Sequence, residues 1–289
     1  IECSCISMKY LGEYMDIHCG GIDNIFPHHT NEIAQSEAYL GHKWCNYWFH
    51  VHHLTEKGGE KISKSKGTML NVDFLISEKM RPIVYRMFAL QSHYRKPLEF
   101  SVDNMTNVGQ AYDKLLRKVA ELKKEAGMNA AEIKALSEKI ETARKTATHN
   151  SEDVAAAIAK AAEGTAVDAG KFFEFSESFG NALYNDINTS SGITVLYDVL
   201  RNEMNAVTKL ALISAFDYVL SLDLCQDTEE AAPAVDAELE AYINAKIAER
   251  KEAKKNKDFA TADAIRNELL EKHIAIKDTR EGTVWEIVE

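Results

Sequence analysis

The spacing of the apolar residues changes near residue 102, and this change constrains the fold more than any other feature of the sequence. Residues 102–223 are rich in Ala, Lys and Glu, and their apolar side chains recur at helical intervals, as in Leu115, Leu116, Val119 and Leu122. Side chains at that spacing share one face of a helix, which packs against other apolar faces. The segment therefore predicts a bundle of helices.

The first hundred residues follow a different pattern. Residues 14–18 form a short β-prone run that ends at a pair of glycines, and residues 45–54 form a longer run of aromatic and β-branched side chains. Between these runs, residues 31–40 have the pattern of a helix, which Gly41 ends. Strand, helix and strand at this length predict a parallel α/β unit.

A small module is predicted at the C-terminus. Residues 224–235 contain a proline and an acidic run, which is typical of a linker. Two helical patterns follow at 236–256 and 259–272, and two β-prone runs then flank a Glu-Gly pair. This order predicts a pair of helices with a β-hairpin.

The charge of the chain is acidic overall but locally basic. The net charge is −11, and residues 102–235 carry 21 Asp and Glu against 13 Lys and Arg. This balance excludes a broadly basic nucleic-acid coat, although it permits local RNA contacts. Residues 246–257 hold six Lys and Arg against two Glu, and the aromatic residues Phe259 and Trp285 follow. Such a run suits single-stranded RNA, and a solvated helix face is the alternative.

The composition also bears on the surroundings of the protein. No run of about 18 apolar residues occurs, so we predict no membrane span. The five cysteines are an odd number, and four of them lie in the first 45 residues. We therefore expect no disulfide framework and a cytoplasmic location. The opening residues fit neither a signal peptide nor a methionine start, so we expect the sequence to begin inside a longer protein.

The decapeptide at residues 58–67, Gly-Gly-Glu-Lys-Ile-Ser-Lys-Ser-Lys-Gly, carries the strongest chemical signal. Its glycines permit tight turns, its serines offer hydroxyl donors, and its lysines place positive charge near a polyanion. Such a loop suits a triphosphate whose α-phosphate is attacked. A solvated basic turn is the alternative, and the Gly-x4-Gly-Lys-Ser/Thr pattern of a P-loop is absent.

The core of this decapeptide, Lys61-Ile62-Ser63-Lys64-Ser65, resembles the K-M-S-K-S signature of class I aminoacyl-tRNA synthetases, with Ile in place of Met. Further motifs narrow the resemblance to the cysteinyl-tRNA synthetases, because they follow in the order and spacing of that family. These motifs are Ile1-Glu2-Cys3-Ser4, Asp16-Ile17-His18, Gly20-Gly21-Ile22-Asp23, the run from Phe26 to Ser36, Tyr47-Trp48-Phe49-His50, His93-Tyr94-Arg95, the run from Asn185 to Thr189, and Gly282-Thr283-Val284-Trp285. The resemblance covers nearly the whole chain.

The resemblance implies a fold class and a division into parts. The fold is expected to be α/β, the second half of a Rossmann-like class I catalytic domain, followed by an α-helical bundle and a small mixed α/β module. Residues 1–68 would form the C-terminal half of the catalytic domain with the basic loop. Residues 69–101 would form a connecting helical region that contacts the tRNA stem. The bundle would occupy 102–223, and residues 236–289 would bind the anticodon.

Three residues match the zinc ligands of the family, namely Cys3, His28 and Glu32. His28 and Glu32 are four residues apart, so a helix that begins near Pro27 would place both on one face. Cys3 is expected to approach from a neighbouring strand end. Without the resemblance, His28 and Glu32 would be an ordinary surface pair and Cys3 a small buried side chain. We expect the adjacent His29 to pack or to hydrogen-bond to the substrate rather than to bind the metal.

The resemblance further implies a reaction, the ATP-dependent ligation of L-cysteine to tRNA(Cys) through a cysteinyl-adenylate. Zinc would bind the substrate thiolate, and ATP would arrive with Mg²⁺. Lys64 would stabilise the pyrophosphate side of the transition state, and Lys61 would assist it or anchor the loop. Asp23 would meet the adenosine ribose, and a turn-capping role is its alternative. No editing domain is expected, and the protein is expected to be a monomer.

Two features leave other interpretations open. The H-I-G-H element and the first ligand cysteine of the family belong to an N-terminal half that these 289 residues do not contain, and Cys19 and Thr30 stand where Gly and Glu are expected. The chain could therefore be a non-catalytic RNA-binding piece. A relative that joins cysteine to an amino sugar in the mycothiol pathway is a further alternative, although it has no anticodon-binding end.

We expect these 289 residues alone to be inactive in cysteine-dependent exchange of pyrophosphate into ATP, because Lys64 would have no properly placed triphosphate to act on. Radioactive pyrophosphate exchange with the purified polypeptide measures this directly. A rate near that of a complete cysteinyl-tRNA synthetase would contradict the expectation.

Overall fold

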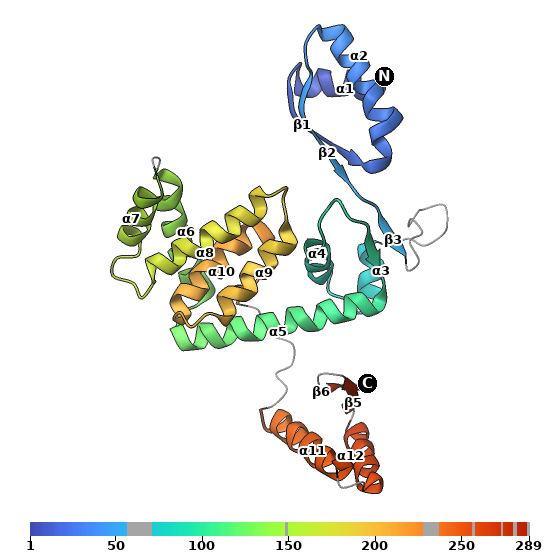
Figure 1. Cartoon of the computed structure of the whole chain (residues 1–289), viewed down its shortest axis with the longest axis vertical. Helices are drawn as coiled ribbons and strands as arrows, with labels where there is room; N and C mark the ends of the chain where they lie inside the picture. The colour runs from blue at the N-terminus through green and yellow to red at the C-terminus, as the bar shows by residue number, and fades with distance from the viewer. Residues whose placement is uncertain are drawn as a thin grey trace. The chain divides into compact units, whose positions relative to one another are not determined.

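The computed structural model describes residues 1–56, 71–147, 150–227, 237–255, 258–272, 274–279 and 282–287 (Figure 1). The chain divides into two compact units, Ile1–Thr228 and Glu229–Glu289. The finer division of the first unit stays a prediction. Among the described helices, none is both long enough and apolar enough to cross a membrane.

The N-terminal part of the first unit is a parallel α/β unit, as the sequence predicts. Strand β1 (Met15–Gly21) pairs in parallel with β2 (Cys45–Val51), and helix α2 (Thr30–Leu40) connects them. Gly41 ends α2 with a positive φ of 75°, a conformation that glycine adopts without strain. Two strands do not define the larger sheet of a Rossmann-like domain, so that finer description remains a prediction.

One local expectation in this part is confirmed and another is wrong. Strand β1 ends at the predicted glycine pair, and Gly20 and Gly21 lie opposite His50 and Val51. Helix α2 begins at Thr30 rather than near Pro27, because a 3₁₀ turn and a π turn, η1 (Ile22–Asn24) and η2 (Ile25–His29), come between β1 and α2. A further helix precedes β1, and it is α1 (Glu2–Leu11).

The predicted strand at 45–54 is interrupted. It divides into β2 and β3 (Leu54–Glu56), and β3 pairs in parallel with β4 (Leu98–Phe100). At the interruption, the backbone N–H of His52 donates to the carbonyl of Tyr94 at 2.9 Å. The short helices α3 (Val72–Ser77) and α4 (Pro82–Leu90) lie between β3 and β4 in the sequence.

The predicted bundle is present. Its six helices in the described part of residues 102–223 are α5 (Val102–Ala126), α6 (Ala130–Thr146), α7 (Ser151–Ala161), α8 (Ala169–Tyr184), α9 (Thr189–Arg201) and α10 (Ala206–Leu220). The stripe on α5 faces the core, since Leu115 and Val119 are each 1% exposed. Helix α10 is the centre of the bundle, because Leu210, Leu212 and Phe216 on several of its faces are buried.

The chain after α10 still belongs to the core, so the predicted start of the linker at Leu224 is wrong. Leu222 and Leu224 are buried. The Asp217 carboxylate accepts the backbone N–H groups of both residues, at 2.7 and 2.8 Å. The hydroxyl of Tyr112 donates to the carbonyl of Leu222 at 2.6 Å. Burial raises the pKa of Tyr112 to about 12, so the hydroxyl keeps its proton at neutral pH.

The second unit confirms the predicted helix pair and hairpin. Helix α11 (Ala237–Lys255) packs on α12 (Phe259–Glu271). Strands β5 (Ile274–Thr279) and β6 (Gly282–Ile287) form an antiparallel pair. A small apolar core forms among the described residues of this unit, from Ile243, Ile265, Leu269, Ile274 and Ile276.

Replacing Tyr112 with Phe should lower the free energy of unfolding by about 1–3 kcal/mol, because the buried Leu222 carbonyl loses its donor. Urea denaturation measures the change. Tyr197→Phe is the matched control, since the hydroxyl of this half-buried tyrosine has no hydrogen-bond partner among the described residues. The control should change stability by less than about 0.5 kcal/mol. Equal losses in both variants would contradict the role of the Tyr112 hydroxyl.

Candidate metal centre

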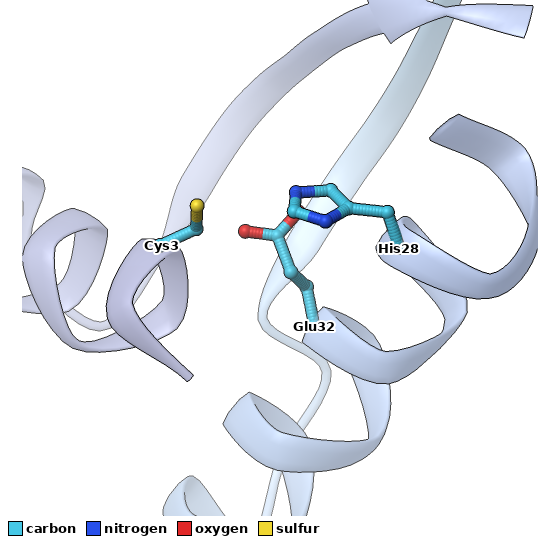
Figure 2. A group of neighbouring side chains, drawn as sticks. All are labelled: Cys3, His28 and Glu32. Carbon is cyan, nitrogen blue, oxygen red and sulfur yellow. The ribbon is translucent and has the colours of Figure 1, made fainter. Parts of the chain in front are cut away.

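Three side chains predicted from the sequence converge at one point. Cys3 comes from α1, His28 from η2 and Glu32 from α2, and one ligand atom from each lies within 4.8 Å of the others. Figure 2 shows the Cys3 thiol and the His28 ring on separate segments, both beside the Glu32 carboxylate. Cys3 lies on a helix rather than at the expected strand end.

Helix α1 is held beside α2 by a part-buried hydrogen bond. The hydroxyl of Ser4, a residue that is 1% exposed, donates to the side-chain carbonyl of Gln35 at 2.8 Å. Ser4 follows Cys3 directly, so this bond helps to place the backbone that carries the thiol. The spacing of four residues places His28 Nε2 3.8 Å from Glu32 Oε2, as the sequence predicts.

Glu32 is the least accessible member of the group. The residue is 3% exposed, and its Oε2 lies 2.9 Å from His18 Nε2. Its Oε1 is buried and has no hydrogen-bond partner among the described residues. A buried carboxylate oxygen without a partner is unfavourable, so a cation at this point would remove the penalty. Thiolate, imidazole and carboxylate together are zinc ligands, so the donor set fits that metal.

A second group shares the same carboxylate. Ligand atoms of His18, His29 and Glu32 also lie within 4.8 Å of one another. His29 is buried, and its Nδ1 lies 2.8 Å from His50 Nε2. Burial, followed by the neighbouring His18 and His50 rings, lowers the pKa of His29. The neutral ring is therefore favoured at neutral pH, and His29 packs in the interior as expected, with His50 as its hydrogen-bond partner.

Sequence reasoning assigned no role to His18 or His50. Both lie in motifs that carry the resemblance, but their positions depend on the pairing of β1 with β2. In that pairing, Gly20 lies opposite His50, and a Cβ at Gly20 would lie 2.6 Å from the His29 ring. Glycine is therefore required at position 20 for the histidines to meet. The available signal in the sequence was that both β-prone runs, which pair as β1 and β2, contain histidine.

The remaining thiols stand apart from both groups. All five cysteines are free, and Cys5 and Cys19 are exposed. Neither belongs to a group of potential metal ligands among the described residues. Cys45 is the first residue of β2 and is buried, and burial raises the pKa of its thiol. Cys3 is therefore the thiol that the geometry places at the candidate site.

The residues predicted for nucleotide binding are only partly described. Lys61 and Lys64 lie outside the described residues. Asp23 lies in η1 with its side chain 53% exposed, and its Oδ1 is 3.6 Å from His53 Nε2. A Cβ at Gly21 would lie 2.4 Å from the same Oδ1, so the carboxylate lies against a backbone that only glycine provides. The role of Asp23 remains a prediction.

Two of the basic side chains in the predicted run on α11 are less available for contacts with RNA phosphates than the composition indicates. Lys246 forms ion pairs with Glu249 at 3.2 Å and Glu268 at 3.1 Å. Arg250 is 7% exposed, so it is part of the interior of this unit. Lys251 is exposed. The side chains of Phe259 and Trp285 lie outside the description, so their stacking on RNA remains a prediction.

Comparison with families of known proteins matches both ends of the chain. Residues 1–110 match the tRNA synthetases class I (C) catalytic domain. Residues 236–285 match the cysteinyl-tRNA ligase anticodon binding domain.

Curated relatives match over nearly the whole chain. The cysteine–tRNA ligase of Brachyspira hyodysenteriae is 34% identical over 292 residues, which cover 99% of this chain and 55% of the relative. The cysteine–tRNA ligase of Lachnoclostridium phytofermentans is 34% identical over 291 residues, which cover 99% of this chain and 56% of the relative. The chain thus spans about half the length of the curated relatives it matches.

Among solved structures, the crystal structure of the ternary complex of Agrobacterium radiobacter K84 agnB2 LeuRS-tRNA-LeuAMS aligns with a TM-score of 0.45 and 14% identity. The alignment covers 78% of this chain and 30% of that chain. A similarity of this size does not bear on the fold or the function here.

Proposed function

The chain belongs to the cysteinyl-tRNA ligase family, and we propose that it contributes to the ATP-dependent ligation of L-cysteine to tRNA(Cys) through a cysteinyl-adenylate. The matches to a catalytic domain at one end and an anticodon-binding domain at the other support this proposal. The observation that carries it is the buried Glu32 carboxylate, which has one oxygen without a partner among the described residues and which forms one group with the Cys3 thiol and the His28 imidazole.

Cys3, His28 and Glu32 would hold a zinc ion. Zinc at this position would supply a soft Lewis acid that prefers the thiolate of cysteine to the hydroxyl of serine. An apolar pocket separates such near-isosteres by only about 10²-fold, so a thiol-selective centre makes editing unnecessary.

The residues around the ligands prepare them for this role. His18 contacts one oxygen of Glu32 and leaves the other directed at the site. A hydrogen bond of this kind orients a ligating carboxylate. Cys3 must lose its proton and His28 must be neutral before either can bind a metal. Metal binding by this set should therefore weaken as the pH falls.

The adenylation step would use the basic loop. Lys64 would neutralise the charge that develops on the triphosphate when the carboxylate of cysteine attacks the α-phosphate, and Lys61 would assist or anchor the loop. Asp23, exposed at the end of β1, would accept hydrogen bonds from the ribose hydroxyls. ATP would enter this reaction with Mg²⁺.

Transfer of cysteine to tRNA(Cys) would use the second unit for anticodon recognition. The match of residues 236–285 to an anticodon-binding domain favours tRNA over the amino-sugar acceptor of the mycothiol-pathway relative. It does not separate an active ligase from a non-catalytic RNA-binding piece. Charging of tRNA(Cys) with labelled cysteine by an enzyme that contains these residues and a complete catalytic domain tests the difference. Binding of the tRNA without charging would favour the RNA-binding alternative.

Zinc binding by the purified chain should depend on Cys3 and Glu32. Cys3→Ser replaces a soft thiolate with a hard hydroxyl, and Glu32→Gln removes the buried charge. Each should lower zinc affinity by at least about tenfold, the scale on which even outer partners of a zinc site matter. Metal analysis after dialysis against a weak chelator measures the retained zinc.

Cys5→Ser is the matched control for the thiol, because Cys5 lies exposed on the same helix and outside the ligand group. It should retain the zinc content of the parent chain. A site lost with Cys5→Ser and kept with Cys3→Ser would show that the assignment names the wrong thiol. Equal zinc in all variants would show that neither Cys3 nor Glu32 is a ligand.

Lys64→Ala, in an enzyme with a complete catalytic domain, should lower the rate of adenylation by roughly 10²–10³-fold, because one charge donor to the transition state is lost. The apparent affinity for cysteine should change little. Pre-steady-state adenylate formation measures both quantities. Lys66→Ala is the control, since Lys66 lies in the same loop outside the signature. A loss of tRNA binding with unchanged adenylation would make the loop an RNA clamp instead.

A further inference from the structure

Asp186, in the turn between α8 and α9, is the centre of a polar cluster that joins distant parts of the first unit. Its carboxylate accepts hydrogen bonds from the Tyr94 hydroxyl and from Arg95, whose Nε and Nη2 lie 2.5 and 3.1 Å from the two oxygens. His93 Nε2 is 3.8 Å away. The partners are more than 90 residues from Asp186 in the sequence, so the cluster fixes the residues 93–95 to the helical bundle.

The start of α9 does not account for Asp186. The sequence predicts that the motif from Asn185 to Thr189 shapes a helix start, and Asn188 does so, because its side chain accepts the backbone N–H of Ser191 at 3.1 Å. Asp186 takes no part in that cap. Its carboxylate is directed instead at Tyr94 and Arg95.

The backbone of the turn is held in an unfavourable conformation. Asp186 and Ile187 have positive φ values of 57° and 53°. This region is disfavoured for a β-branched side chain, and Ile187 gains little burial from it, since it is 50% exposed. Such a conformation persists where surrounding contacts hold it, and it is common at functional positions. The contacts that hold it here include those of Asp186.

Tyr94 also connects the cluster to β2, the strand that carries His50. The Tyr94 ring stacks on Phe49 of β2, with ring centroids 4.1 Å apart. The Tyr94 carbonyl accepts the His52 N–H, and the His53 carbonyl accepts the Leu98 N–H at 3.2 Å. The β3–β4 ladder then continues the pairing to Glu56. Residues 94–100 thus contact the segment 49–56 at Phe49 and from His52 to Glu56.

This segment belongs to the candidate site at its start. His50 follows Phe49 directly, and its ring contacts His29 at 2.8 Å. His29 in turn belongs to the group around Glu32. Contacts therefore lead from Asp186 through Tyr94 to Phe49, and from the adjacent His50 through His29 to the carboxylate of Glu32, which His29 Nε2 approaches to 3.9 Å.

We propose that Asp186 is a positioning residue, which through Tyr94 and Arg95 holds the segment 49–56 in place beside the metal centre. The effect of Asp186 on catalysis rests on the proposed function, whereas its effect on the position of the segment 49–56 does not. Arg95, followed by Tyr94, lowers the pKa of Asp186 to about 2, so the carboxylate is charged throughout the neutral range.

Hydrogen–deuterium exchange of the full chain tests the proposal. Asp186→Asn keeps the shape of the side chain and removes its charge, so the amides of His52 and Leu98 should exchange about tenfold faster. Amides in α10 should be unchanged. Tyr94→Phe keeps the ring on Phe49 and removes only the hydroxyl, so it should accelerate the same amides less. The double variant should resemble Asp186→Asn alone, because both changes break one unit.

Asp198→Asn is the matched control, because Asp198 also pairs with an arginine, Arg201, at 3.1 Å on the surface of α9. This control should leave the amides of His52 and Leu98 unchanged. Exchange within about twofold of the parent chain in Asp186→Asn would overturn the proposal. Equal acceleration in α10 would also overturn it, because Asp186 would then act on global stability rather than on position.

A second experiment compares the same variants kinetically, in an enzyme with a complete catalytic domain. Asp186→Asn should lower kcat of cysteine-dependent pyrophosphate exchange several-fold, with the zinc content unchanged and with Asp198→Asn near the parent. Faster amide exchange with unchanged kcat would overturn the catalytic part of the proposal. If the parent enzyme shows no exchange activity, the proposed function fails, and the amide measurement still decides the positioning role.

Discussion

The carboxylate of Glu32 is the constraint on which the N-terminal site depends. A carboxylate that is 3% exposed requires compensation, and within the described part of the chain only one of its two oxygens has a hydrogen-bond partner, His18. Cys3 and His28 converge on the same point from separate segments. A thiolate alone would add repulsion, so this arrangement of donors favours a cation among them.

The sequence predicts the parts of this site that depend on local periodicity. The spacing of four residues between His28 and Glu32 sets their proximity, and the resemblance supplied Cys3. Local patterns cannot place His18 and His50 on either side of His29, because their positions follow from the register between β1 and β2. The same limit applies to the fold. Local patterns predict its strands, bundle and hairpin. They do not predict the interruption between β2 and β3, where the His52 N–H donates to the distant carbonyl of Tyr94.

The helical bundle contacts residues 93–95 through the turn at Asp186. Its interior follows from the apolar stripes, but the Asp186 turn could not be found by periodicity, because its partners lie 91 and 92 residues away. The sequence contains both motifs without showing that they meet. Their contact lies where the bundle, the β3–β4 pair and the strand from the metal centre come together. The polar contacts of Asp186 therefore add to an apolar core that already joins residues 75–100 to the bundle.

In the proposed metal centre, the Cys3 thiolate binds zinc together with His28 and Glu32. Zinc-edge X-ray absorption of the zinc-loaded chain detects this thiolate, because sulfur and nitrogen or oxygen neighbours are distinguished by bond length. We predict one sulfur at about 2.3 Å together with nitrogen and oxygen donors, and loss of the sulfur signal in Cys3→Ser. A spectrum with nitrogen and oxygen donors only, as the group of His18, His29 and Glu32 would give, would contradict the account.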